Sequence, residues 1–320
     1  MRFPIRSGVA VLAMMFVAAA AAVIVFGYQT DIGQARERVA MGSQIVQTAC
    51  GPIEYAAIGD GSPVLIVHGA GGGFDQGMDF AAPLAKSGFR VIAMSRFGYL
   101  RTPLPADASA MAQADAHACL LDALNIPRAA ILGASAGAPS SLQFALRHPN
   151  RCTALVLVVP AVFVPREGGA PPLRAPTATE FLFNTALKSD LLFWAAIKLA
   201  RPILVQAILA TPPAVVENAS VDEQARVDET LRHILPINPR RLGLQNDAMV
   251  TSTLVRYDLE RIAVPALVIS TADDLFGTFD GARYTAEHIP RARFVGYQDG
   301  GHLAVGHQKE LISEIAAFLK

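Results

Sequence analysis

One serine of this chain has the neighbours of an enzymatic nucleophile. Ser135 lies in the segment Gly133-Ala134-Ser135-Ala136-Gly137, where small residues flank it on both sides. An apolar run precedes the segment and a helix-forming run follows it, which predicts a sharp strand-to-helix turn with an exposed hydroxyl. Such a hydroxyl can attack a carbonyl carbon once a nearby base accepts its proton. The alternative is a turn rich in glycine and alanine whose serine has no chemical role.

A second glycine-rich segment follows an apolar run earlier in the chain. His68-Gly69-Ala70-Gly71-Gly72-Gly73 comes directly after the β-branched run 64–67. Attack on a carbonyl puts negative charge on its oxygen, and preorganised backbone N–H groups stabilise that charge. We therefore expect the amides of Ala70 and Ala136 to form an oxyanion hole. The phosphate-loop pattern G-x-x-x-x-G-K-[ST] and the dinucleotide pattern G-x-G-x-x-G are both absent from this segment.

Two aspartates and a histidine follow the last two predicted strands. Asp273 and Asp274 come shortly after the apolar run 266–270. His302 comes after the run 292–297. An imidazole in that loop can reach the serine as a general base, and a carboxylate can fix the tautomer of the imidazole. The alternative is that the aspartates only cap the turn or the helix that follows.

The order of these segments resembles the α/β-hydrolase family. In that family a His-Gly loop follows the third strand, a G-x-S-x-G turn follows the fifth, and the acid and the histidine come later in the chain. The resemblance covers residues 43–320 apart from a helical insertion, and it implies a catalytic triad of Ser135, Asp274 and His302. It favours Asp274 as the acid, with the register open by one residue because Thr271 stands where the family often has glycine.

The loop after the fourth predicted strand also resembles the family. Ser95-Arg96-Phe97-Gly98-Tyr99 is similar to its Arg-x-Gly-[Tyr/His]-Gly loop near the mouth of the site. Two positions differ, since Ser95 stands where aspartate is common and Leu100 where glycine is. We assign this segment no role beyond shaping its loop.

The elements that must position these groups alternate along the chain. Short apolar runs such as 64–67, 129–132 and 154–159 alternate with segments of helical spacing. This alternation predicts an α/β fold with a mostly parallel central sheet and helices on both faces. All the candidate groups then fall at the carboxyl ends of strands, which is the edge where open α/β sheets bind ligands.

The pattern divides the chain into four parts. Residues 1–30 form a membrane anchor or signal segment, and residues 43–164 form the first part of the α/β-hydrolase core. Residues 165–261 are rich in proline and helical patterns, so we expect a helical cap inserted over the site. Residues 262–320 complete the core. The apolar residues of the insertion, Trp194 among them, suggest an apolar acyl pocket or the interior of the cap itself.

The N-terminal segment is long enough to cross a membrane. No charged residue occurs between Arg6 and Asp31, and the stretch 8–26 is almost wholly apolar, which matches the ~20 residues of a spanning helix. Arg2 and Arg6 precede it, so the positive-inside tendency puts the catalytic domain on the periplasmic or extracellular side. A cleaved signal peptide and a secreted protein are the rival interpretation, although the apolar run exceeds the usual ~7–15 residues. Residues 31–42 are then a short polar linker.

The composition argues against several other classes of protein. The 27 basic and 27 acidic residues cancel, and no basic stripe is present to bind nucleic acid. Three cysteines are too few for a disulfide framework. Cys119 and Cys152 could pair, or the cysteines could be small buried apolar residues. No metal-ligand spacing or cofactor motif occurs, so we expect neither a metal nor a cofactor.

These observations predict a serine hydrolase that cleaves a carboxylic ester or a related acyl bond through an acyl-enzyme. The expected partners are an apolar small-molecule substrate and, through the N-terminal segment, a membrane; no oligomeric state is predicted. Hydrolysis of a carbon–carbon bond, thioester hydrolysis and acyl transfer stay open on the same residues. A non-catalytic, membrane-anchored binding protein of this fold is a further alternative.

Overall fold

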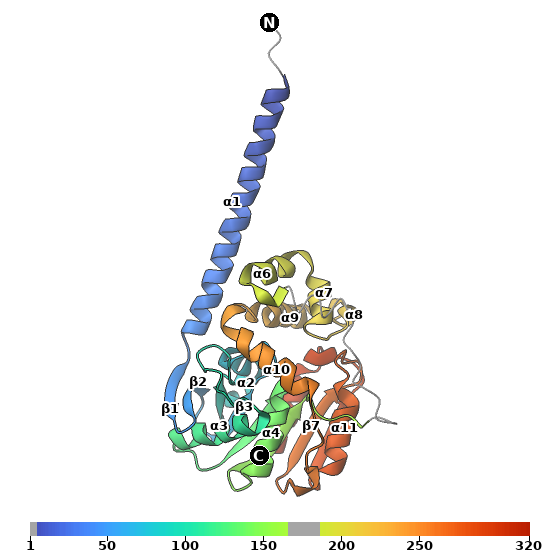
Figure 1. Cartoon of the computed structure of the whole chain (residues 1–320). Helices are drawn as coiled ribbons and strands as arrows, with labels where there is room; N and C mark the ends of the chain where they lie inside the picture. The colour runs from blue at the N-terminus through green and yellow to red at the C-terminus, as the bar shows by residue number, and fades with distance from the viewer. Residues whose placement is uncertain (1–4, 166–185) are drawn as a thin grey trace.

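An eight-stranded sheet forms the centre of the protein in a computed structural model that describes residues 5–165 and 186–320 (Figure 1). The strand order is β1-β2-β4-β3-β5-β6-β7-β8. The pairs β1–β2 and β2–β4 are antiparallel, and all other pairs are parallel. The predicted α/β class with a mostly parallel sheet is therefore confirmed. The strands are β1 Gln44–Thr48, β2 Gly51–Ile58, β3 Ser62–Val67, β4 Phe89–Met94, β5 Ala129–Ala134, β6 Cys152–Val158, β7 Ala266–Thr271 and β8 Ala292–Tyr297.

Helices cover both faces of this sheet, which explains why its middle strands are apolar. Every residue of β7 is buried, and so are the last four residues of β3. One apolar layer joins the sheet to α3, α4 and α11, and a second layer joins it to α2 and α12. The helices are α2 Phe74–Lys86, α3 Ala110–Ala123, α4 Ala138–Arg147, α11 Thr278–His288 and α12 Gln308–Leu319.

A group of helices lies between β6 and β7 in the chain and forms an apolar cluster of its own. Phe193, Leu204 and Leu231 are buried in this cluster. These helices belong to the predicted insertion 165–261, of which residues 166–185 lie outside the described residues. They are α6 Asp190–Leu199, α7 Arg201–Ala207, α8 Pro213–Glu217, α9 Val221–His233 and α10 Arg241–Ser252.

The N-terminal helix α1, Ile5–Ala40, runs from the apolar segment into the folded part of the chain (Figure 1). Its apolar part has a mean hydropathy of 2.4 and is exposed, so the helix is long and apolar enough to span a membrane or to act as a signal sequence. The expected polar linker is instead the last part of this helix. Ile32 and Ala35 are buried there, in contact with the helices of the insertion.

The cysteines pair differently from the pairing considered from the sequence. Cys50 forms a disulfide with Cys119, and their Cα atoms are 6.0 Å apart. Cys152 is a free, buried thiol at the start of β6. The pairing of Cys119 with Cys152 is therefore wrong, because the sheet brings the turn between β1 and β2 against α3, which carries Cys119.

Candidate active site

Ser135 stands at the sharp turn between β5 and α4. Its φ of 48° lies in the left-handed region, which costs residues other than glycine roughly 1–3 kcal/mol. Small neighbours allow the backbone to turn there. A Cβ on Gly133 would lie 2.4 Å from Ser141 Oγ. A Cβ on Gly137 would lie 2.4 Å from the Val67 carbonyl oxygen, so both glycines of the G-x-S-x-G pattern are required by close contacts.

A chain of hydrogen bonds connects Ser135, His302 and Asp274. The Ser135 hydroxyl lies 2.9 Å from His302 Nε2, and Nδ1 of the same ring lies 2.8 Å from Asp274 Oδ2. When Nδ1 donates its proton to the carboxylate, Nε2 is left to accept the proton of the serine hydroxyl. The three residues follow β5, β7 and β8, whose carboxyl ends meet at one edge of the sheet. This arrangement can activate an alcohol for attack on a carbonyl.

Asp274 is the most buried member of this chain. Its carboxylate accepts hydrogen bonds from the Phe276 amide, at 2.9 Å, and from the Thr278 hydroxyl. Burial raises the pKa of Asp274, but the His302 ring and these hydrogen bonds together lower it by more, so the pKa lies below its ordinary value. The carboxylate is therefore ionised at neutral pH and can hold the imidazole in one orientation.

Asp273, the other aspartate that the sequence leaves open, contacts the backbone of the next loop. Its oxygens accept the amide of Gly300 at 3.3 Å and that of Gly301 at 2.8 Å. Both glycines have a positive φ, 116° and 59°, so the loop bends tightly just before His302. The structure thus brings Asp274 to the imidazole, while Asp273 fixes the loop that carries it.

The glycine-rich loop after β3 lies against Ser135. A Cβ on Gly69 would lie only 3.1 Å from the Cβ of Ser135. Ala70 and Ser135 line the same cavity, and Ala136 follows Ser135 within the short helical turn 135–137. Amides in the first turn of a helix have no acceptor within the helix and are free to bind an anion. The structure therefore places both predicted oxyanion residues beside the serine.

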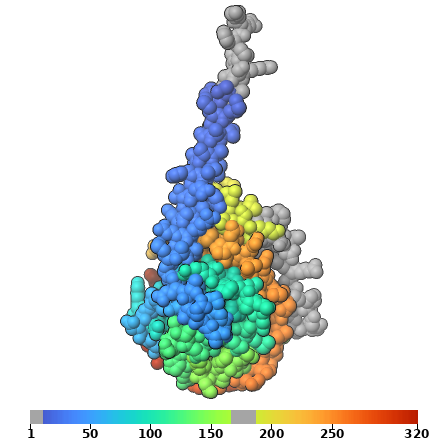
Figure 2. All heavy atoms as spheres, turned by 60° about the vertical axis from the view of Figure 1, so that its left-hand side comes forward, coloured from blue at the N-terminus to red at the C-terminus, as the bar shows by residue number. Residues whose placement is uncertain are grey.

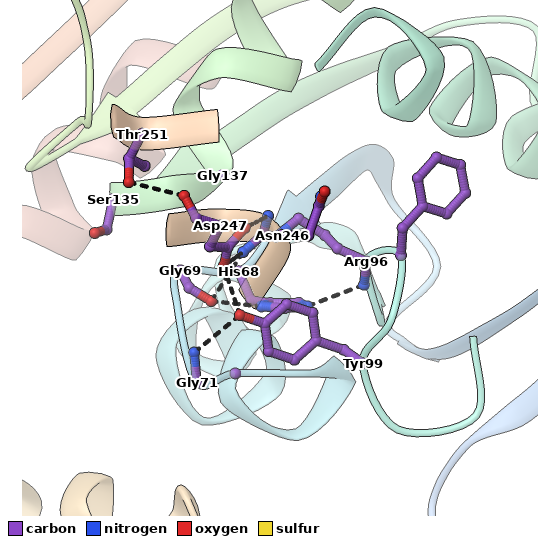
Figure 3. Close-up of polar contacts among 12 residues, drawn as sticks. His68, Gly69, Gly71, Arg96, Tyr99, Ser135, Gly137, Asn246, Asp247 and Thr251 are labelled. Carbon is purple, nitrogen blue, oxygen red and sulfur yellow. Dashed lines mark hydrogen bonds and ion pairs between the residues drawn. The ribbon is translucent and has the colours of Figure 1, made fainter. Parts of the chain in front are cut away.

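Buried polar side chains hold this loop in place (Figure 3). The Gly69 carbonyl accepts hydrogen bonds from His68 Nδ1, at 2.7 Å, and from Arg96 Nη2, at 3.2 Å. The Tyr99 hydroxyl accepts the Gly71 amide at 3.2 Å. His68 Nε2 accepts the Arg96 amide at 3.0 Å, which leaves the proton of the ring on Nδ1. Burial holds the pKa of His68 well below its usual value, so this ring is neutral.

Two buried ion pairs connect the helical insertion to this region. Asp247 of α10 binds Arg96 through both of its oxygens, each at 2.6 Å (Figure 3). Arg240, just before α10, binds Asp75 of α2 at 2.6 and 3.1 Å. The same guanidinium donates to the Gly72 carbonyl at 2.5 Å. Both arginines therefore contact the glycine-rich loop and a carboxylate, so α10 and the loop are held together by charge.

These arginines are functional candidates that the sequence analysis missed. It gave Arg96 no role beyond shaping its loop and assigned no function to Arg240. The sequence carries one signal of this role. Arg96 lies within an apolar stretch, and a guanidinium that is buried there requires a carboxylate partner. The partner Asp247 lies 151 residues away, so no local spacing identifies it.

We expect Asp247→Asn to destabilise the protein and to lower its activity. The change removes the charge that faces Arg96 and the acceptor that the Tyr99 hydroxyl reaches at 2.5 Å. A guanidinium left without its carboxylate costs about 3–5 kcal/mol of unfolding free energy. Denaturant unfolding measures this loss, and the turnover of a p-nitrophenyl ester at a temperature where the variant is folded measures the effect on the loop.

The matched control is the double variant Arg96→Met with Asp247→Leu. Replacing both charges by apolar side chains removes the unpaired ion, so stability should return to within about 2 kcal/mol of the wild type. Activity should stay low in this variant, because Gly69 loses the hydrogen bond from the guanidinium. Full activity in the double variant would contradict a role of the ion pair in positioning the loop.

His117 gives the protein a predictable sensitivity to acid. Burial lowers the pKa of this histidine from 6.5 to about 3, whereas the unfolded chain takes up the proton near pH 6.5. The unfolded state thus binds more protons between these values, so stability falls as pH drops below about 6.5, by up to ~1.4 kcal/mol per pH unit for this group. Unfolding curves of the wild type and of His117→Gln between pH 7 and 4 test this, since the variant should show a shallower slope. Equal slopes would contradict the assignment.

A cavity of about 210 Å³ opens beside Ser135 and His302. Core and insertion both line it, and most of the lining side chains are apolar. The apolar side chains include Phe80, Val158, Val159, Leu187, Ile208, Leu209, Ile234, Leu244 and Phe276. Among its polar lining residues, His233 of α9 contacts Asp79 of α2 at 2.5 Å. Within the described ranges, no group of three or more His, Cys, Asp or Glu side chains could hold a metal ion.

Comparison with known proteins relates this geometry to one family. Residues 62–306 match the family profile described as alpha/beta hydrolase fold. An uncharacterised hydrolase of Bacillus subtilis, YcgS, is 25% identical over 259 residues, which are 79% of this chain and 89% of that protein. The 2-hydroxy-6-oxo-6-phenylhexa-2,4-dienoate hydrolase of Comamonas testosteroni is 31% identical, but over only 34% of this chain and 40% of that enzyme.

Solved structures show the same fold over nearly the whole chain. An alpha/beta hydrolase fold protein from Nakamurella multipartita has a TM-score of 0.68 and 28% identity, with 87% of this chain and 98% of that chain covered. An esterase from Exiguobacterium antarcticum has a TM-score of 0.63 and 18% identity, with coverages of 86% and 97%. The similarity to the esterase concerns the fold alone.

Proposed function

Because the chain belongs to the alpha/beta hydrolase fold family, we propose that it is a serine hydrolase that cleaves carboxylic esters through an acyl-enzyme on Ser135. The observation that carries this proposal is the unbroken hydrogen-bonded chain from the Ser135 hydroxyl through His302 to the Asp274 carboxylate. An alcohol, an imidazole and a carboxylate in this order are the groups that nucleophilic acyl transfer requires.

In the first half of the reaction, Ser135 Oγ attacks the ester carbonyl carbon while its proton passes to His302 Nε2. The carbonyl oxygen becomes an oxyanion, which the amides of Ala70 and Ala136 stabilise. When the intermediate collapses, the bond to the alcohol breaks and the proton on Nε2 passes to the departing oxygen. Asp274 stabilises the imidazolium that exists between these two proton transfers.

In the second half, water replaces the alcohol. His302 Nε2 takes a proton from the water, whose oxygen attacks the acyl carbon and again forms an oxyanion. The bond to Ser135 Oγ breaks, the proton on His302 returns to the serine, and the carboxylic acid leaves. The net reaction adds one water to the ester and restores the enzyme.

The lining of the cavity favours an apolar acyl group. Side chains such as Phe80, Leu209 and Leu244 face the space next to Ser135, and burial of a methylene against such surfaces contributes about 0.8 kcal/mol. A chain that lies along these side chains would bring its carbonyl to the serine. We therefore propose an ester with an apolar acyl moiety as the substrate.

Hydrolysis of a carbon–carbon bond is the second candidate, because part of the chain is similar to hydrolases whose names specify dienoates. A dienoate carries a carboxylate, which needs a cation or several donors in its site. Among the described lining residues of the cavity, Arg226 is the one lysine or arginine, and Glu223 binds it at 2.7 Å. This neutralised cation favours the ester over the dienoate.

Labelling with a fluorophosphonate probe tests the proposal directly, because the probe reacts only with an activated serine. The full chain should be modified on Ser135, and Ser135→Ala should remain unmodified. A folded protein that stays unlabelled would disprove the proposed mechanism. Turnover of p-nitrophenyl esters of increasing acyl length then defines the substrate, and faster turnover of 2-hydroxy-6-oxo-6-phenylhexa-2,4-dienoate than of every ester would favour the second candidate.

We also propose that α1 is an uncleaved anchor and that the hydrolase domain lies on the periplasmic or extracellular side. One observation supports the anchor and a second supports the location of the domain. The helix continues without a break from its apolar part to Ile32 and Ala35, which are buried in the fold. The disulfide between Cys50 and Cys119 is typical of an oxidising compartment.

The anchor predicts the N-terminus of the mature protein. Sequencing of the protein from the membrane fraction should find a start before Gly8, because an uncleaved span keeps the whole apolar segment. A start near Val23 would instead show that a signal peptidase removes most of the span.

A further inference from the structure

The insertion exposes large apolar side chains close to the N-terminal helix. Leu191 and Leu192 of α6, Leu199 at its end and Ile203 of α7 expose between 46% and 86% of their surface. We call these four residues the cap patch. Single apolar residues scattered on a surface are common and need no explanation. Whether the cap patch marks an interaction surface therefore depends on where it lies.

The helix that carries most of the cap patch packs on α1 where the apolar segment ends. The rings of Tyr28 and Trp194 are 5.6 Å apart, and Trp194 Nε1 donates to Asp31 at 2.8 Å. Lys198 binds the same aspartate at 2.9 Å. Phe26, the last residue of the apolar run, is 75% exposed just before these contacts begin. A membrane crossed by the apolar part of α1 would therefore end at the level of α6.

The two views of the molecule agree with this position. Figure 1 shows α6 beside α1, at the end of the insertion that lies farthest from the sheet. Figure 2 shows the spheres of the same region of sequence against α1, where the helix leaves the folded part. The cap patch thus belongs to the part of the insertion that is next to the proposed span.

The polar residues around the cap patch suit the surface of a bilayer. Tyr28 is half-buried and of a type enriched at membrane interfaces, whereas Trp194 is buried. The segment 186–207 carries three basic residues and one acidic residue, Asp190, which is buried. The basic residues are Lys188, Lys198 and Arg201. Lys198 and Arg201 are paired with Asp31 and Asp228, so the segment presents little net charge. Its leucine and isoleucine side chains suit the boundary between headgroups and acyl chains.

We propose that α6 and the start of α7 rest on the lipid surface, with the cap patch inserted among the headgroups beside α1. The partner is the lipid bilayer that the apolar part of α1 crosses. The inference goes beyond the proposed hydrolysis and does not depend on it; it rests on the membrane span proposed for α1. The insertion then holds one face of the hydrolase against the membrane, in addition to the tether that α1 supplies.

Spin labels on the full-length protein test this contact. Leu199→Cys and Ile203→Cys, each labelled with a nitroxide, are placed in vesicles of phosphatidylcholine and phosphatidylglycerol. The native cysteines do not compete, because Cys50 and Cys119 are bonded and Cys152 is buried. The control label replaces Met111, which is 51% exposed on α3.

For each label we compare its accessibility to oxygen, which concentrates in lipid, with its accessibility to a water-soluble nickel complex. We expect the ratio of oxygen to nickel accessibility to be several-fold higher at positions 199 and 203 than at position 111. Equal ratios at all three positions, in protein that floats with the vesicles, would overturn the proposal. Shielding of 199 and 203 from both reagents would also overturn it, since a protein surface would then cover the patch. Failure of the protein to float would remove the span on which the proposal rests, whatever its hydrolytic activity.

A second experiment uses the single tryptophan of the chain. Brominated phosphatidylcholine should quench the fluorescence of Trp194 in the wild type. Leu199→Glu with Ile203→Glu should reduce this quenching several-fold, because the charges leave the bilayer surface, while Met111→Glu should leave it unchanged. Both glutamates replace exposed side chains, so the fold is retained. Undiminished quenching in the double variant would contradict the proposal.

Discussion

Replacement of Ser135 by alanine is expected to lower kcat for p-nitrophenyl esters by roughly 10⁵–10⁶-fold, with little change in KM. The variant has no oxygen at the position 2.9 Å from His302 Nε2, so no acyl-enzyme can form. Alanine adopts the φ of 48° at about the same cost as serine, so the turn should keep its shape. Steady-state kinetics together with the thermal unfolding midpoint separate loss of chemistry from loss of structure.

Ser141→Ala is the matched control for this variant. Ser141 is also buried near the turn, and its hydroxyl donates to the Gly137 carbonyl at 3.0 Å. It has no contact with His302, so its removal should leave kcat within about tenfold of the wild type, the effect of one lost hydrogen bond of ~1 kcal/mol. Equal activity of Ser135→Ala and Ser141→Ala would exclude Ser135 as the nucleophile.

The second large effect is expected at Asp274. The change Asp274→Asn keeps the size of the side chain but removes the charge beside the imidazole, 2.8 Å from Nδ1. The amide can donate to Nδ1, which would place the proton of the ring on Nε2, the atom that must accept from Ser135. We expect kcat to fall on the order of 10³–10⁴-fold, as when a buried triad aspartate is made neutral. Kinetics with p-nitrophenyl esters measure this loss.

Asp273→Asn is the natural comparison, because the two aspartates are adjacent and change in the same way. Asp273 accepts two backbone amides of the loop before His302, one on each oxygen, and the single oxygen of asparagine can still accept the closer one, that of Gly301. A loss of no more than about tenfold is expected, from weaker fixing of the loop. The opposite order of effects would assign the acid to Asp273 and shift the register by one residue.

The parts of the site that depend on local sequence could be predicted. The turn at Ser135 is encoded by Gly133 and Gly137, which are close to it in the chain and are needed for close backbone contacts. His302 and Asp274 could be found because each follows an apolar strand, and parallel strands end at the same edge of the sheet. What these residues do in catalysis stays a prediction.

The parts that depend on distant contacts could not be predicted. The ion pair of Arg96 with Asp247 joins a core loop to the insertion, and neither residue has a spacing that identifies the other. The disulfide is similar, since Cys50 meets Cys119 only because the edge of the sheet lies against α3. The sequence predicts a linker at residues 31–42, because the contacts of Asp31 with Trp194 and Lys198 join residues more than 160 positions apart and leave no local pattern.

The two ion pairs beside α10 hold the insertion to the core more tightly at α10 than at α9. Parting α10 from the core would leave the buried guanidinium of Arg96 without its carboxylate, which is strongly unfavourable. Where α9 meets α2, the contact is that of His233 with Asp79, a carboxylate with 47% of its side chain in solvent. Water can replace that contact with little change in free energy. We therefore expect a substrate to enter by a movement of α9 while α10 stays on the core.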